Sequence, residues 1–164
     1  MSKIKYKTAL SLIMSFSTFA IFSAYFIQYV LKHQPCNLCL IERIPYIISI
    51  IIISICLFLK KFEKNSLRVL SLIFFFSALL AFYHFGIEQG FIKESLVCDL
   101  NNESNLLSKE AILKQLNQLP ISCKDVTFKI FGLSLATFNI FISLILGITT
   151  MKLFLTYEKN KSKI

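Results

Sequence analysis

The stretch "TALSLIMSFSTFAIFSAYFIQYVL", residues 8–31, contains no charged side chain. A helix needs roughly 20 apolar residues to cross the hydrocarbon core of a bilayer, so this stretch is long enough to span. Its apolar core is too long for a secretory signal, and "IFSAYF" is a poor cleavage site. We therefore interpret the segment as a retained transmembrane helix.

Three further apolar segments follow, at about residues 41–59, 67–86 and 130–154. The core of the second, "IPYIISIIIISICLFL" (44–59), reaches spanning length only if its helix begins earlier, near Cys39. The chain has 164 residues, of which 55% are hydrophobic, and a mean hydropathy of +0.67. A soluble domain of this size cannot cover so many apolar side chains with polar surface. The sequence predicts an all-α membrane protein, a single integral domain over 1–164 with a bundle of four transmembrane helices.

The net charge of +9 is distributed in a way that encodes topology. Basic residues lie just outside the apolar segments and are not mixed with loop aromatics or glycines, which disfavours nucleic-acid binding. The basic stretches fall on one side of a four-span chain, and short basic loops face the cytoplasm. We expect both termini in the cytoplasm and the loops at about 32–40 and 87–129 on the periplasmic side of a bacterial inner membrane. The basic residues on the predicted cytoplasmic side are Lys3, Lys5, Lys7, Lys60, Lys61, Lys64, Arg68, Lys152, Lys159, Lys161 and Lys163.

The long outer loop contains the pattern of a short amphipathic helix, "LLSKEAILKQLNQLP" (106–120). Ser108 is a suitable N-cap and Pro120 a suitable stop. The helix either lies on the membrane surface or packs on the rest of the protein.

Four of the five cysteines, Cys36, Cys39, Cys98 and Cys123, fall in the predicted outer loops. Cys56 lies inside the second apolar segment, where we interpret it as a small apolar packing residue. The exterior of a bacterial inner membrane is oxidising, so four outer cysteines favour two disulfides, with three possible pairings.

The two outer pairs differ in their expected role. Cys98 and Cys123 bracket the amphipathic segment, and a bond between them would suit a structural link. The CxxC of Cys36 and Cys39 closes too short a loop to gain much chain entropy, and such pairs are more often reactive. A zinc site is disfavoured because the second pair lacks metal-ligand spacing, and because no histidine accompanies it in the sequence.

Arg43 follows Cys39 by four residues. If one helix carries both, they share a face, and the guanidinium and the helix N-terminus would stabilise a Cys39 thiolate. Arg43 could also donate to an oxygen that gains charge, such as a quinone carbonyl. The alternatives are an interfacial anchor or a pair with Glu42. Pro45 fits the first turn of a helix that begins near Arg43, or kinks one that begins earlier.

His84 and Glu88 lie four residues apart at the outer end of the third segment. One helix face can present both, at the level of the CxxC. They are candidates for a quinone site or for proton handling, and the alternative is that they are ordinary interfacial residues.

The patches "PCNLCLIERIPY" (35–46), "YHFGIEQG" (83–90) and "FGLSLATFN" (131–139), with the second cysteine pair between them, carry a family resemblance. The chain resembles the DsbB family of disulfide-bond-forming oxidases. Its members often have Pro and Trp at the places of Ala136 and Phe138, which weakens any role for this stretch in cofactor contact.

The resemblance implies a thiol:quinone oxidoreductase with two redox-active disulfides, Cys36–Cys39 and Cys98–Cys123. A DsbA-like thioredoxin-fold partner would attack the second disulfide at Cys98. Electrons would then reach the first pair through a transient Cys36–Cys123 link, and Cys39 would pass them to ubiquinone or menaquinone.

The resemblance also implies that Arg43 would stabilise charge on the ring oxygen. His84 and Glu88, from their own placement, are the further candidates for the cofactor site. Two other functions compete. Vitamin K epoxide reductase homologues share a four-helix layout, but their CxxC lies late in the chain. A non-enzymatic membrane protein would use the disulfides only as structural links.

Overall fold

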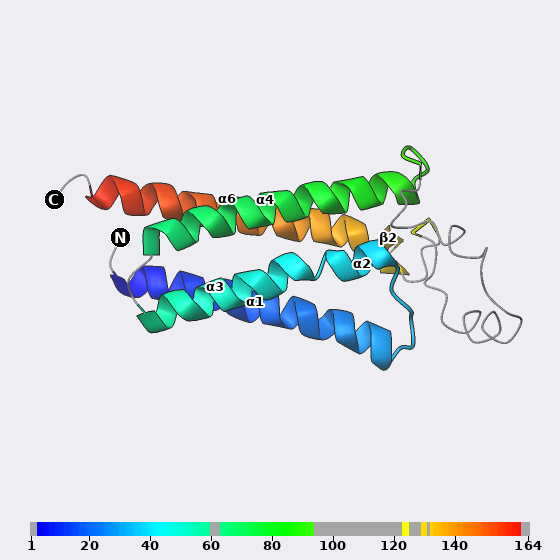
Figure 1. The fold of residues 1–164 in the computed structure, drawn as a ribbon, viewed down its shortest axis with the longest axis horizontal. Coiled ribbons are helices and arrows are strands. Elements are labelled where there is room, and N and C mark those ends of the chain that lie inside the picture. Colours follow the sequence, from blue (N-terminus) through cyan, green and yellow to red (C-terminus); the bar gives the residue numbers. More distant parts are fainter. Residues whose placement is uncertain (1–2, 60–62, 94–122, 125–128, 131, 162–164) are drawn as a thin grey trace, which may run out of the picture.

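The computed structural model describes residues 3–59, 63–93, 123–124, 129–130 and 132–161. Four long helices run side by side along the longest axis (Figure 1). Helix α4 packs against α6, α1 against α3, and α3 against α4. The amphipathic segment at 106–120 and Cys98 lie outside the described residues. The elements are α1 (Lys3–Tyr29), α2 (Asn37–Ile41), α3 (Ile44–Leu59), α4 (Glu63–Glu88), β1 (Lys129–Ile130), β2 (Leu133–Ser134) and α6 (Leu135–Lys161).

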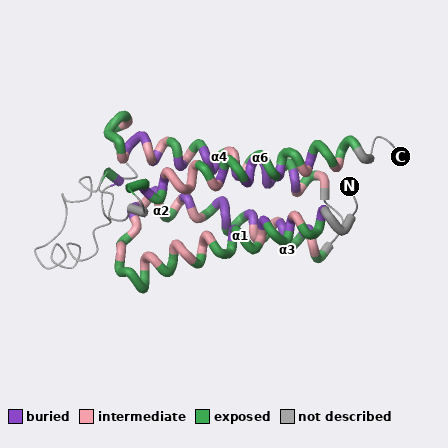
Figure 2. The backbone as a smooth tube through the Cα atoms, turned by 180° about the vertical axis from the view of Figure 1, so that it is seen from behind, coloured by how far each residue is buried: buried purple, intermediate pink, exposed green. Residues whose placement is uncertain are grey.

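The bundle is apolar on its outside. Phe22 is 67% exposed, Phe58 86% and Leu79 69%, and exposed positions follow the outward faces of the helices (Figure 2). Water would penalise such a surface, whereas lipid does not. Four stretches of the described residues are long and apolar enough to cross a membrane, which confirms the predicted all-α, four-span architecture: Tyr6–Tyr29, Asn37–Phe58, Lys64–Glu88 and Leu135–Lys159.

Small polar side chains lie between the helices. Ser17, Ser49, Ser77 and Ser143 are fully buried, beside a core that includes Phe74. Small residues let membrane helices approach closely, and hydroxyls bond across them. The Ser77 and Ser143 hydroxyls lie 3.0 Å apart and join α4 to α6.

The second span is broken into α2 and α3. Pro45 occupies the first turn of α3 and has no N–H, so the carbonyl of Ile41 receives no helical hydrogen bond from it. The Arg43 N–H instead bonds the Leu40 carbonyl in a tight turn, at 3.2 Å. The sequence left open whether one continuous helix carries Cys39 and Arg43, and the structure separates them by this break.

Helix α6 begins at Leu135, later than the apolar segment predicted from about residue 130. The residues before it form an antiparallel hairpin, with Ile130 paired to Leu133. Gly132 has a φ of 82° in the turn, which favours glycine. Ser134 then caps α6, because its Oγ accepts the Thr137 N–H at 3.3 Å.

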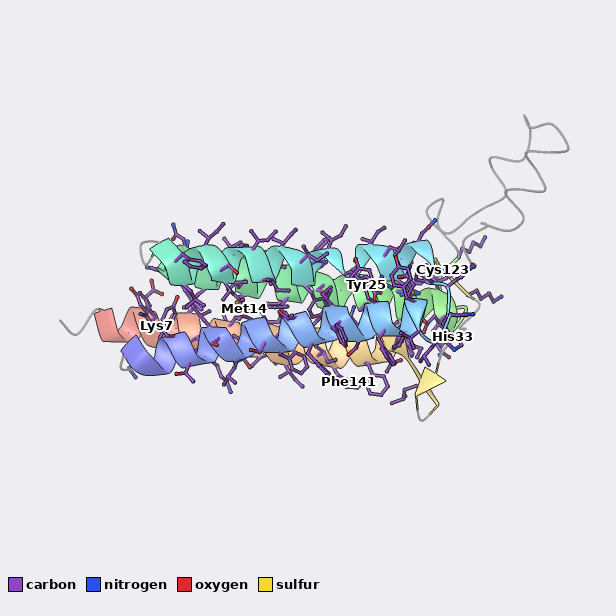
Figure 3. The ribbon with its side chains drawn as sticks, turned by 90° about the horizontal axis from the view of Figure 1, so that it is seen from below. Lys7, Met14, Tyr25, His33, Cys123 and Phe141 are labelled. Atoms are coloured by element: carbon purple, nitrogen blue, oxygen red, sulfur yellow. The ribbon has the colours of Figure 1, made fainter. Side chains whose placement is uncertain are left out.

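Both chain ends lie at one end of the bundle, and α2 lies at the other (Figure 1). Figure 3 shows Lys7 near the first end, with His33 and Cys123 at the second. The helices thus place the CxxC at the end remote from the termini.

Candidate functional site

The thiol pair forms the first turn of α2. Cys36 is the N-cap residue in an extended conformation, with φ −72° and ψ 167°. Its Sγ accepts the Cys39 N–H at 3.3 Å and lies 2.7 Å from the Cys39 Sγ. Both residues carry free thiols. Oxidation to a disulfide, with an S–S bond of about 2.05 Å, requires only a small movement.

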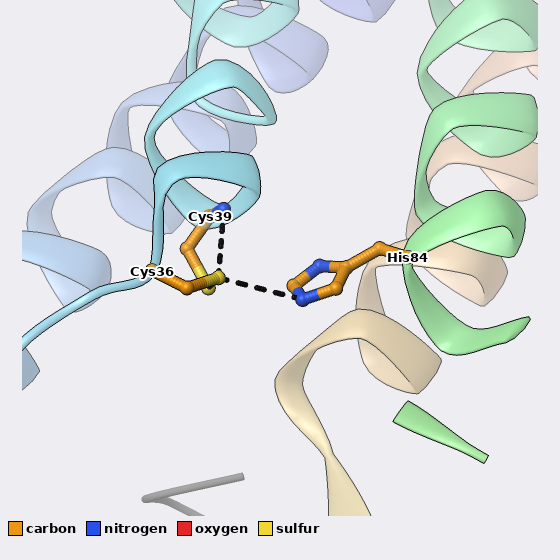
Figure 4. A group of neighbouring side chains, drawn as sticks. All are labelled: Cys36, Cys39 and His84. Carbon is orange, nitrogen blue, oxygen red and sulfur yellow. Dashed lines mark hydrogen bonds between the residues drawn. The ribbon is translucent and has the colours of Figure 1, made fainter. Parts of the chain in front are cut away.

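The Cys36 sulfur also faces His84, whose Nε2 lies 3.5 Å away (Figure 4). The hydrogen bond from the Cys39 side chain lowers the pKa of Cys36 to about 4, against the opposing effect of burial. The hydrogen bond and charge of His84 and the Cys39 N–H add to the lowering. These contacts favour the thiolate form of Cys36.

A chain of buried hydrogen bonds fixes His84. Its Nδ1 lies 2.7 Å from Oε1 of Glu42, and Oε2 of Glu42 accepts from Nδ2 of Asn139 at 2.8 Å. Tyr46 donates its hydroxyl to Oδ1 of Asn139 at 2.5 Å. With Nδ1–H directed to the carboxylate, Nε2 is left to exchange a proton with Cys36. Residues at the junction of α2 and α3, on α4 and on α6 together orient this imidazole.

A second carboxylate, Glu88, lies near Nε2 of His84, the ring nitrogen remote from Glu42. Its Oε1 lies 3.7 Å from Nε2 of His84, and its side chain is 6% exposed. Oε2 has no hydrogen-bond partner among the described residues. The predicted approach of His84 and Glu88 on one helix face is what the structure shows.

Arg43 reaches away from the thiols toward α1. Its Nη1 donates to Oε1 of Gln28 at 2.6 Å, and the guanidinium carbon lies 5.0 Å from the ring centre of Tyr25. The break before α3 directs the side chain to this neighbour, so Arg43 is held at a fixed position.

A cavity of about 340 Å³ connects these groups, within the size range of small-molecule sites. Its walls are mainly apolar side chains from α1 and α6, including Phe16, Ile27 and Ile142. Ala136 and Phe138, at the departures from the family pattern, are also part of the lining. Its polar lining includes Gln28, His33, Gln34, Cys36, Cys39, Glu42, Arg43, Tyr46, His84, Glu88 and Asn139.

The remaining cysteines occupy two different settings. Cys123 is disulfide-bonded, 2% exposed, and packed in one cluster with Cys36. Cys56 lies in the apolar core, 4% exposed, with the Tyr6 hydroxyl 3.4 Å from its sulfur. Cys56 is therefore far from the CxxC and packed as expected for an apolar residue.

Sequence reasoning missed three members of the network. Glu42 entered only as a partner for Arg43, and Tyr46 and Asn139 were not considered. Asn139 and Ser143 form a polar pair inside the fourth apolar segment. Polar groups inside spans usually have a partner or a function, so this pair was the sequence signal for the network.

Four membrane-length helices that hold a reactive thiol pair against a buried histidine and an apolar cavity define a membrane thiol–disulfide protein. The family model "Disulfide bond formation protein DsbB" matches residues 6–153. The chain belongs to this DsbB family, which confirms the resemblance and implies disulfide-generating thiol oxidoreductase activity in a multi-pass membrane protein.

A similar protein is known from Rickettsia prowazekii (strain Madrid E), under the name "Uncharacterized protein RP370". It is 29% identical over 160 residues, which cover 96% of this chain and 92% of the relative. No solved structure matches the chain.

Proposed function

We propose that the protein reoxidises a periplasmic DsbA-like thioredoxin-fold protein and delivers the electrons to a membrane quinone. The partner dithiol loses two electrons and two protons, which pass through Cys98–Cys123 and then Cys36–Cys39. The observation that carries the proposal is the buried Cys36–His84–Glu42 arrangement at the end of a membrane-embedded apolar cavity.

Exchange between the two pairs takes place at Cys36. Cys36 and Cys123 pack in one cluster, so a Cys123 thiolate can attack the Cys36 sulfur of a Cys36–Cys39 disulfide and release Cys39. Cys98 then attacks Cys123 and forms the Cys98–Cys123 disulfide, which leaves the CxxC reduced. The described thiol states fit that stage, because Cys123 is disulfide-bonded and the CxxC is free.

His84 handles the proton of the thiol pair. Its Nδ1 is held by Glu42 at 2.7 Å, which keeps Nε2 facing Cys36. A histidine in this position stabilises the thiolate and can pass the proton onward during oxidation. Asn139 acts through Glu42 and is a positioning residue.

The cavity suits a quinone. Its apolar walls from α1 and α6 match a ring with an isoprenoid tail, and its polar end brings Cys39 and Arg43 to one space. When bound, ubiquinone or menaquinone supplies an acceptor for two electrons and two protons. Arg43, fixed by Gln28 and Tyr25, is placed to donate to a ring oxygen, and Glu88 is the second polar group beside His84.

The membrane orientation follows from the basic residues. Both termini, which lie at the same end of the bundle, face the cytoplasm, and the redox cysteines face the periplasm of a bacterial inner membrane. The four candidate spans are Tyr6–Tyr29, Asn37–Phe58, Lys64–Glu88 and Leu135–Lys159. Thiol chemistry then occurs in the oxidising compartment.

Trapping of thiols in whole cells tests this function. Cells with and without respiratory quinones are treated with a mass-adding alkylating reagent, and the modified cysteines are identified on the protein. Without quinone, Cys36 and Cys39 should accumulate as thiols, while a Cys56→Ser variant should behave like the unaltered chain. If all four outer cysteines stay oxidised in both cultures, the disulfides are structural links and the proposed function fails.

A further inference from the structure

Three soft or borderline metal ligands converge at the CxxC in the dithiol state. Cys36 Sγ, Cys39 Sγ and a ring nitrogen of His84 all lie within 4.8 Å of one another. They come from the start of α2 and from α4, far apart in the chain, so the sequence did not show them together (Figure 4). Thiolate and imidazole are the ligand types that zinc prefers.

The distances approach those of a tetrahedral site. Ligand atoms around zinc lie roughly 3.4–3.8 Å apart, given Zn–S of about 2.3 Å and Zn–N of about 2.0 Å. The Cys36 sulfur and His84 Nε2 are already 3.5 Å apart. The two sulfur atoms, now at 2.7 Å, would separate by about 1 Å, which a side-chain rotation supplies.

The imidazole has the outer support that metal-binding histidines usually have. Its Nδ1 is bonded to the Glu42 carboxylate at 2.7 Å, and that carboxylate is fixed in turn by Asn139. A carboxylate–histidine arrangement of this kind fixes the ring orientation and strengthens Nε2 as a ligand.

Glu88 is the candidate for a fourth ligand, and it lies just outside the group of three atoms that meet within 4.8 Å. Its Oε1 lies 3.7 Å from the same Nε2, a separation typical of two ligands on one ion. Its buried Oε2 has no hydrogen-bond partner among the described residues. A buried carboxylate oxygen without a partner is costly, and a cation would satisfy it.

We propose that the reduced CxxC is also a binding site for a thiophilic divalent cation, with zinc as the natural ion. Cys36, Cys39 and His84 are the ligands already in place, and Glu88 reaches the ion through a side-chain rotation. Binding displaces the Cys39 thiol proton and creates two metal–thiolate bonds. Oxidation to the Cys36–Cys39 disulfide removes both sulfur ligands and releases the ion.

Metal and electron acceptor therefore compete for the same sulfur atoms. While zinc is bound, neither sulfur can form the disulfide, so the ion holds the protein in its reduced state. The inference requires only the dithiol state and stands whether or not the acceptor is a quinone.

Cobalt(II) is the probe, because tetrahedral thiolate coordination gives it visible bands and an ultraviolet charge-transfer band. The full chain in detergent is compared in its reduced and oxidised forms, without any substitution. A second series uses a Cys98→Ser/Cys123→Ser background, so that the CxxC supplies the outer thiols. Affinity for zinc is measured by competition with a chromophoric chelator.

The reduced chain should bind one cobalt ion with tetrahedral bands that zinc abolishes, and the oxidised chain should show none. His84→Ala should weaken zinc binding at least about tenfold and shift the bands, and Glu42→Gln should weaken it about 10–100-fold. Cys56→Ser, in the apolar core, should leave both readouts unchanged.

Equal binding by reduced and oxidised chains would overturn the inference, because the sulfurs would then not be ligands. An unchanged spectrum and affinity in His84→Ala would also overturn it. Loss of reversible thiol oxidation with intact cobalt binding would instead contradict the proposed function, so the two can fail separately.

Discussion

Replacement of His84 with alanine should raise the pKa of the Cys36 thiol. His84 Nε2 lies 3.5 Å from the Cys36 sulfur, and it contributes both a hydrogen bond and a charge to the lowering. A hydrogen bond to a charged group contributes about 1.5–3 kcal/mol, and a change of one in pKa equals about 1.36 kcal/mol. The pKa should therefore rise by about two, from about 4 to about 6.

The pH dependence of Cys36 alkylation measures this change. Only the thiolate reacts, so the rate rises with pH through the pKa and then reaches a plateau. Near pH 5 the unaltered chain should be about 90% thiolate and the variant about 10%, which makes the variant roughly tenfold slower. Near pH 8 the two rates should be similar, because both thiols are then largely ionised at pKa values of about 4 and about 6.

The assay uses the reduced chain in detergent with iodoacetamide and a metal chelator, and mass spectrometry quantifies modified Cys36. Cys56→Ser is the matched control and should keep a midpoint near 4, the value of the unaltered chain. A His84→Ala midpoint that stays near that value would refute the contribution of His84 to stabilising the Cys36 thiolate.

Three further substitutions separate the parts of the site. Asn139→Leu removes a 2.8 Å hydrogen bond to Glu42. Oxidation of the CxxC by quinone, followed by stopped flow, should slow about tenfold, because a hydrogen bond to a charged group contributes about 1.5–3 kcal/mol. An unchanged rate would contradict the positioning role of Asn139. Arg43→Ala should raise the KM for quinone about tenfold or more, as expected for the loss of a charge-assisted hydrogen bond. The rate of attack by the partner thiol should change little, and equal loss of both steps would argue against the assigned role. Cys56→Ala should lower the free energy of unfolding by about 1 kcal/mol, through lost packing with Tyr6, and should keep full activity. Thermal unfolding and a turnover assay measure the two effects. A large loss of activity would overturn the role of Cys56 as a packing residue.

The four helices could be predicted because each follows from a local property, a long stretch of side chains that lipid accepts and water does not. The approach of His84 to Glu88 could also be predicted, since helical periodicity places residues four apart on one face. The pairing of Cys36 with Cys39 could be predicted from the CxxC spacing alone. All of these depend on contacts within a single segment.

The missed features depend on contacts between segments. Glu42 and Asn139 are 97 positions apart, and no local pattern relates them. The break between α2 and α3 was left open because Pro45 is compatible with either a kink or a first turn. That break turns Arg43 toward Gln28 and leaves Cys36 to face His84.

Stoichiometric electron transfer tests the central proposal most directly. The purified protein is mixed with a reduced DsbA-like partner and a soluble quinone, and partner thiols and quinone absorbance are followed together. The account predicts that one quinone is reduced for each disulfide formed in the partner, and that the reaction is lost in Cys36→Ala and in Cys39→Ala. Partner oxidation without consumption of quinone, or quinone reduction that persists in both variants, would contradict it.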